Sequence, residues 1–194
     1  MNKTLLLIVI LFSFKLHSQE IVKSFDGKLE FNLTKKCDDN NCKITKIEIL
    51  KNGEIIQTVL PGKNSFSKTF PNKQLIVLND MNFDGNTDFR IMESHTKEIW
   101  RSNTSLLYWI YNPLNQFFEK RVEYEVITSP EFDYEKKEIN SIWRDGCCKH
   151  GRDVYKLINE IPLFTERFVI GRKPDNTEYY EHWKVVEGEL KKVE

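Results

Sequence analysis

The sequence predicts an all-β fold, in which antiparallel hairpins form a sandwich or a propeller-like domain around one strand–calcium loop–strand unit. Three observations predict this class. Turn signals recur about every eight to twelve residues along the chain. The runs between these signals are rich in β-branched and aromatic residues, which favour strands. No stretch keeps an apolar period of 3.6 residues over the length of a helix.

The clearest hairpin joins predicted strands at 43–51 and 54–60 through Asn52-Gly53, because Asn-Gly supplies the positive φ angles of a type I′ turn. The run 106–111, LLYWIY, is apolar and aromatic, so we expect a buried strand there. A cysteine-bearing loop is predicted at 145–152. The other predicted strands lie, in chain order, on both sides of 37–42, at 66–70, on both sides of 80–88, and at 116–126, 132–134, 138–143, 154–158, 164–170, 178–186 and 189–193.

The loop 80–88, DMNFDGNTD, carries the most distinctive chemistry of the chain. Oxygen-bearing side chains stand at its positions 1, 3, 5 and 9, with glycine at position 6 for a sharp turn, which is the spacing of a calcium loop. Calcium accepts six to eight oxygens in irregular geometry, whereas magnesium requires a stricter octahedron. We therefore predict a Ca²⁺ site, and its expected ligands are Asp80, Asn82, Asp84, Asn86 (through its carbonyl) and Asp88.

This loop differs from an EF-hand in two respects. Position 12 is Ile91, where an EF-hand has a bidentate glutamate, and the flanking residues predict strands instead of helices. The alternative is a polar β-turn, because Asn, Asp and Gly are common turn residues. Three carboxylates within nine residues repel one another, however, and a cation would relieve that repulsion. The pattern therefore favours calcium.

The N-terminus predicts a secretory signal peptide at 1–18, because Lys3 precedes a short apolar run and Ser18 offers a small residue for cleavage. The run is too short to span a bilayer comfortably, so a retained membrane anchor is the less favoured alternative. No cysteine lies near the cut to carry a lipid. We expect 19–194 to form a single exported domain, periplasmic or extracellular.

Charge excludes one class of partner. Cleavage after Ser18 removes Lys3 and Lys15 from the 29 basic residues and none of the 29 acidic ones, leaving a formal charge of 27 − 29 = −2. Proteins that bind nucleic acid are strongly basic, so we expect no nucleic-acid partner.

The four cysteines form two close pairs, Cys37/Cys42 and Cys147/Cys148. Export places them in an oxidising compartment, so disulfide bonds are expected. A Cys37–Cys42 bond would join two predicted strands, and a bond between Cys147 and Cys148 would link adjacent residues. Cross-pairing between the two sets is the competing arrangement. A four-thiolate zinc site is a further alternative, but the spacing fits no standard zinc pattern.

Three segments carry a resemblance to a known family: LIVLNDMNFDGNTDFRIME, YWIYNPLNQFFEK and PEFDYEKKEINSIWRDG. Over residues 74–186 the chain resembles a bacterial periplasmic family with an Asp-rich calcium-type loop between strands. That family includes immunity proteins that inhibit lysozyme-like peptidoglycan hydrolases delivered by rival secretion systems. The resemblance implies metal ligation by the loop and a hydrolase as partner. The loop is also similar to FG-GAP-type repeats of β-propellers, but it occurs once here.

Catalysis has little support in the sequence, and we predict no enzymatic activity. Cys148 and His150 could be drawn as a nucleophile pair, but disulfide formation would consume the thiol. The histidines are otherwise isolated from any acid–nucleophile set. Carboxylates are plentiful, so a secreted hydrolase with an unrecognised carboxylate pair is the least favoured of three hypotheses.

The favoured hypothesis is an exported inhibitor of a peptidoglycan hydrolase, and the second is a cell-surface module that binds glycans or other exported proteins. Tryptophans could stack on sugar rings in the second case, although aromatic residues in strands belong more often to the core. The candidates are Trp100, Trp109, Trp143 and Trp183.

Overall fold

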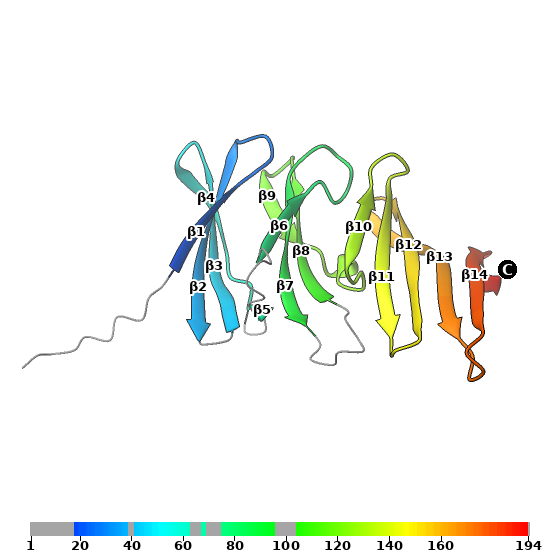
Figure 1. The fold of residues 1–194 in the computed structure, drawn as a ribbon. Coiled ribbons are helices and arrows are strands. Elements are labelled where there is room, and N and C mark those ends of the chain that lie inside the picture. The colour runs from blue at the N-terminus through cyan, green and yellow to red at the C-terminus, as the bar shows by residue number, and fades with distance from the viewer. Residues whose placement is uncertain (1–17, 39–40, 63–66, 69–74, 96–103, 194) are drawn as a thin grey trace, which may run out of the picture.

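Three antiparallel sheets make up the fold, which confirms the all-β prediction. The computed structural model describes residues 18–38, 41–62, 67–68, 75–95 and 104–193. These residues contain fifteen strands and one short 3₁₀ helix, Val122–Tyr124. The three sheets lie side by side in chain order (Figure 1). Within the described ranges, no helix is long and apolar enough to cross a membrane.

The N-terminal sheet has the order β1-β2-β3-β4. Strand β5 pairs with the first two residues of β3, Asn41 and Cys42. Asn52 and Gly53 join β3 to β4 with φ angles of 53° and 84°, so the predicted hairpin turn is confirmed. Of the predicted strand 66–70, the structure describes the two residues of β5. The strands are β1 (Ser18–Lys23), β2 (Leu29–Asp38), β3 (Asn41–Lys51), β4 (Glu54–Val59) and β5 (Ser67–Lys68).

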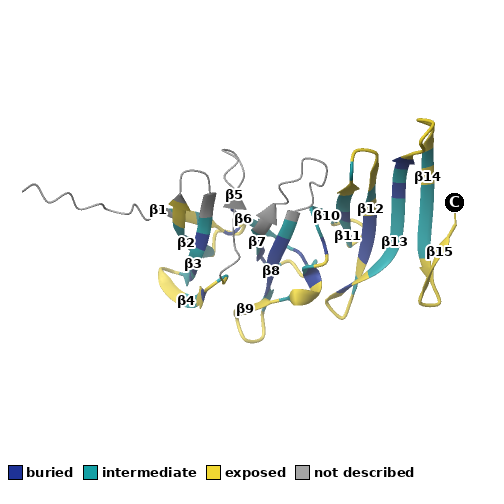
Figure 2. Ribbon diagram, turned by 90° about the horizontal axis from the view of Figure 1, so that it is seen from below, coloured by how far each residue is buried: buried dark blue, intermediate teal, exposed yellow. Residues whose placement is uncertain are grey.

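The middle sheet has the order β6-β7-β8-β9 and holds the predicted loop between its first two strands. Its strands are β6 (Ile76–Asn79), β7 (Asp88–His95), β8 (Thr104–Asn112) and β9 (Phe117–Lys120). Five consecutive residues of β8, 106–110, are buried, and the middle of the strand is dark blue (Figure 2). The expectation of a buried strand at 106–111 is met, with Tyr111 partly exposed.

The apolar run of β8 is continuous because both faces of the middle sheet are covered. Successive side chains of a strand point to opposite faces. Leu107 and Trp109 pack with the N-terminal sheet, in a cluster that includes Phe31 and Ile47. Leu106, Tyr108 and Ile110 belong to a second cluster shared with the C-terminal sheet. The middle sheet is therefore the central layer of the stack.

The C-terminal sheet has six strands in the order β10-β11-β12-β13-β14-β15. It extends beyond the middle sheet: among the described residues, β14 and β15 contribute no side chain to either apolar cluster, and β15 is exposed along its length (Figure 2). The strands are β10 (Pro130–Asp133), β11 (Glu138–Asp145), β12 (Lys149–Ile158), β13 (Ile161–Arg172), β14 (Glu178–Val186) and β15 (Glu189–Lys192).

Two sequence predictions need correction. The strand predicted at 116–126 ends at Lys120, because the chain turns through the 3₁₀ helix and buries Tyr124, whose hydroxyl donates to the Glu160 carbonyl at 3.1 Å. The loop predicted at 145–152 is shorter, because β11 continues to Asp145 and β12 begins at Lys149. Residues 1–17 of the predicted signal peptide lie outside the described ranges, and Ser18 begins β1.

Candidate functional site

The loop between β6 and β7 is held by its own acidic side chains. Asp80 accepts hydrogen bonds from the backbone N–H groups of Asp84, at 3.0 Å, and Gly85, at 2.9 Å. Asn82 Oδ1 also accepts from Asp84 N–H, at 3.3 Å. Asp84 Oδ1 in turn accepts from Asn86 N–H at 2.7 Å. Positions 1, 3 and 5 of the predicted calcium loop therefore converge on one turn.

The backbone of this turn needs two left-handed residues. Gly85 adopts φ +88°, as the sharp-turn position of the motif requires. Phe83 adopts φ 61°, which is uncommon for a bulky residue. Its ring packs edge-on against Phe132 and Tyr134, with ring centroids 6.2 and 5.6 Å away. The loop is thus anchored to the C-terminal sheet as well as to its own.

Asp88, the ninth position, lies behind the turn and is fully buried. Its Oδ2 accepts from Met81 N–H at 2.7 Å, and its Oδ1 accepts from Tyr111 N–H at 2.8 Å. The carboxylate therefore ties the start of the loop to strand β8. Burial raises the pKa of Asp88 to about 7, the two N–H donors oppose this rise, and the nearby charges of Asp84 and Asp80 add to it.

The donor set is compatible with calcium. All the predicted ligands offer hard oxygens, and an ionised carboxylate has about four acceptor positions, of which Asp88 uses two for backbone N–H groups. Within the described ranges, no three His, Cys, Asp or Glu side chains form a group that could hold a metal. The structure thus brings Asp80, Asn82 and Asp84 together and turns Asp88 toward the core. The calcium site itself stays a prediction.

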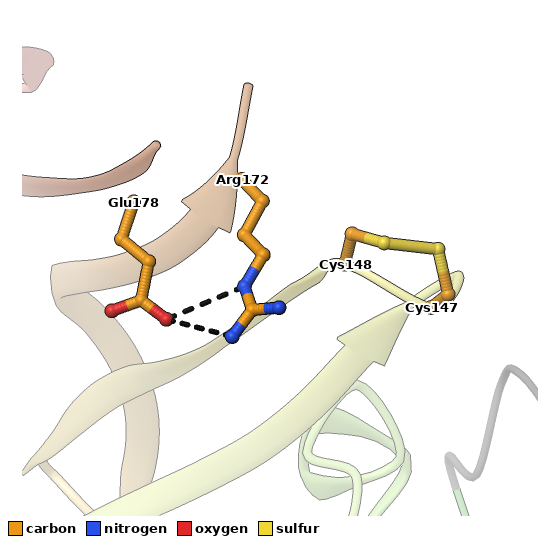
Figure 3. Close-up of a disulfide and its surroundings, with 4 residues drawn as sticks. All are labelled: Cys147, Cys148, Arg172 and Glu178. Carbon is orange, nitrogen blue, oxygen red and sulfur yellow. Dashed lines mark hydrogen bonds and ion pairs between the residues drawn. A yellow bond between two sulfur atoms is a disulfide. The ribbon is translucent and has the colours of Figure 1, made fainter. Parts of the chain in front are cut away.

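The two cysteine pairs lie in different parts of the fold. Cys147 and Cys148 are bonded to each other at the turn between β11 and β12, beside the ion pair of Arg172 and Glu178 (Figure 3). Arg172 N–H donates to the Cys148 carbonyl at 3.0 Å, which fixes this turn against β13. The pairing rules out cross-pairing and a four-thiolate zinc site, and it consumes the thiol of the Cys148–His150 alternative.

Cys37 is disulfide-bonded, and its partner in the β2–β3 ladder is Cys42. The side chain of Cys42 lies outside the described part of the chain, so the Cys37–Cys42 bond stays a prediction. Among the described residues no cysteine is free.

The tryptophans have different surroundings. Trp109 is a core residue whose ring stacks on Phe89 at 5.0 Å. Trp100 lies outside the described residues. Trp143 and Trp183 are partly exposed on one face of the C-terminal sheet, where Trp143 Nε1 donates to Asp153 at 2.9 Å. Sequence reasoning missed this polar network, because it treated β11, β12 and β13 as separate segments and did not pair them.

No protein-family model and no curated protein matches the chain. One solved structure shares its fold and is described as that of a Xanthomonas type IV secretion system related protein. The TM-score is 0.69, the sequence identity is 16%, and the match covers 91% of this chain and 93% of the other. A likeness at this identity shows the fold alone.

Proposed function

We propose that this protein is an exported, calcium-stabilised inhibitor of a lysozyme-like peptidoglycan hydrolase. The observation that supports it most is the likeness of the fold, over nearly the whole of both chains, to a protein related to a type IV secretion system. An exported binding protein would meet cell-wall hydrolases in the cell envelope. The acidic loop between central strands agrees with the calcium-type family that the sequence resembles.

Binding, as opposed to catalysis, is supported by the state of the carboxylates. A general acid needs a raised pKa and access to substrate. Among the described residues, the carboxyl group with a raised pKa is Asp88, which is fully buried and bonded to backbone. Two carboxylates nearer the solvent have pKa values shifted the other way: hydrogen bonds from Arg172 lower the pKa of Glu178, and one from Lys192 lowers that of Glu181.

Calcium would act as a structural element of this inhibitor. Asp80, Asn82 and Asp84 would hold the ion from the solvent side of the turn, and Asp88 would approach from the core. The ion would neutralise the repulsion among these carboxylates. The loop contacts the C-terminal sheet through Phe83. An ion that orders the loop would therefore help to position the middle sheet against the C-terminal sheet.

The proposal is tested with a suspension of purified peptidoglycan and a panel of lysozyme-like hydrolases. Turbidity is followed with and without the purified chain, in calcium and in chelator. We expect stoichiometric inhibition of at least one hydrolase. Absence of inhibition across the panel would contradict the proposal, and clearing of the suspension by the chain alone would indicate a hydrolase.

A further inference from the structure

One face of the C-terminal sheet carries aromatic side chains outside both core clusters. Cross-strand partners share a face of the sheet. Trp143 pairs with Gly151, Gly151 with Val169, and Gly171 with Tyr179. Trp183 stands opposite Arg167 on the same face. We call Trp143, Val169, Tyr179 and Trp183 the aromatic platform.

Two of these rings lie over glycines in the interior of strands. A Cβ added at Gly151 would lie 2.4 Å from Cζ2 of Trp143, and a Cβ added at Gly171 would lie 2.4 Å from Cζ of Tyr179. Each ring therefore occupies space that a side chain would otherwise fill, and lies against the backbone of the neighbouring strand. Val169, between them, is only 4% exposed although it belongs to neither core cluster. Both rings remain partly exposed.

The two indole rings of the platform are oriented by carboxylates. Trp143 Nε1 donates to Asp153, which also accepts two hydrogen bonds of 2.7 Å from Arg167. Trp183 Nε1 donates to Glu181 at 3.2 Å. Both N–H groups are therefore satisfied before any ligand arrives, and a ligand would contact the parts of the rings that the neighbouring cations leave exposed.

The charges on this face balance one another. Asp153 is paired with Arg167, and Glu181 accepts a hydrogen bond of 2.9 Å from Lys192. Arg167 also lies over the Trp143 ring, 5.6 Å from its centroid, and Lys192 lies over Trp183 at 5.8 Å. A charged polymer would have to disrupt these pairs, so the charge pattern favours a neutral ligand rich in hydrogen-bonding groups.

A hollow of about 270 Å³ borders the platform beside Trp143. Thr128, Ser141 and Lys149 contribute polar groups to its wall. A few placed polar groups next to aromatic surface are typical of small-molecule sites. The Thr128 and Ser141 hydroxyls bond to each other at 3.3 Å, so the Lys149 ammonium is the group of this wall that a ligand hydroxyl would approach.

We propose that the platform binds a neutral β-1,4-linked glycan, with sugar rings stacked on Trp143 and Tyr179. Chains with this linkage form flat ribbons whose apolar C–H faces match flat aromatic rings, and their hydroxyl groups suit the polar rim. Chitin, cellulose and the glycan backbone of peptidoglycan all have this linkage and these apolar ring faces. The inference is independent of the inhibitor proposal, because its site and its test involve no hydrolase.

The test is calorimetric titration of the purified full chain with chitohexaose and, separately, with cellohexaose. These two arms distinguish an N-acetylated glycan from a plain glucan. We expect binding of at least one hexamer, with a change in tryptophan fluorescence. Tyr179→Ala should weaken binding about tenfold or more, because it removes one stacking surface, while Tyr179→Phe keeps the ring and should retain affinity.

The matched control is Tyr180→Ala. Tyr180 is the next residue, is 66% exposed, and points to the opposite face of the sheet. Near-ultraviolet circular dichroism establishes that each variant is folded. Three results would overturn the proposal: neither hexamer binds at about 1 mM, folded Tyr179→Ala binds like wild type, or Tyr180→Ala loses as much affinity as Tyr179→Ala. In each case the rings serve only to cover the glycines.

Discussion

Replacing Asp88 tests how the acidic loop is tied to the core. Its carboxylate is fully buried and accepts hydrogen bonds from the N–H groups of Met81 and Tyr111. Asp88→Ala would leave both donors buried and unpaired, at a cost of about 1–3 kcal/mol each. The expected loss is therefore about 2–6 kcal/mol, which is a large share of the roughly 5–15 kcal/mol that stabilises a typical domain.

Urea titration in chelator measures this loss as a fall in the free energy of unfolding. Asp88→Asn keeps one acceptor oxygen and should lose about half as much. Glu189→Ala, an exposed change at the other end of the stack, is the matched control and should stay within about 0.5 kcal/mol of wild type. An Asp88→Ala protein as stable as wild type would refute the reasoning.

The same carboxyl group predicts a pH dependence. Burial raises the pKa of Asp88 from 3.8 to about 7, so the folded state binds its proton more tightly than the unfolded chain does. Its contribution to stability is therefore complete below about pH 4 and is lost as the pH rises to about 7. At 1.36 kcal/mol per pKa unit, the free energy of unfolding should fall by about 4 kcal/mol over this pH range. The free energy of unfolding of wild type, measured relative to that of Asp88→Asn, should fall by about this amount between these pH values. A constant difference would contradict the assignment.

Three further predictions concern the cysteines, the N-terminus and the core. Thiol labelling of the exported protein under denaturing, non-reducing conditions should modify no cysteine, and stoichiometric labelling of Cys147 or Cys148 would show that their bond is absent in solution. N-terminal sequencing should find Gln19 first in the mature protein, whereas an intact Met1 would disprove export by cleavage. Trp109→Ala should destabilise the fold by about 3–5 kcal/mol in urea titration, because it removes a buried ring that stacks on Phe89; a loss below about 1 kcal/mol would place Trp109 outside the core.

Local signals in the sequence predicted much of the fold. Asn52-Gly53 specified its turn because few other residues adopt positive φ at both positions. The apolar run of β8 predicted a buried strand, although it did not indicate which side chains face which neighbour. The spacing of Asp80, Asn82 and Asp84 predicted that they meet in one turn, and they do.

Features that depend on pairing between distant segments could not be predicted. Asp88 has the residue type and spacing of a ligand, but Tyr111 N–H, which draws it toward the core, is contributed by β8. Gly151 fell within the loop predicted at 145–152, but the sheet register places it in a strand under Trp143 and places Gly171 under Tyr179. The 3₁₀ helix after Lys120 depends likewise on Tyr124 reaching the carbonyl of Glu160.

The role of calcium is tested most directly by thermal unfolding of wild type and Asp84→Ala, each in chelator and in millimolar calcium. Binding to the folded state alone stabilises by about 1.4 kcal/mol at tenfold excess over Kd. For a chain of this size that corresponds to a rise in Tm of roughly 3–6 °C. We predict this rise for wild type and its loss in Asp84→Ala. An equal Tm of wild type in both conditions, with no heat of calcium binding in calorimetry, would show that the loop is only an acidic turn.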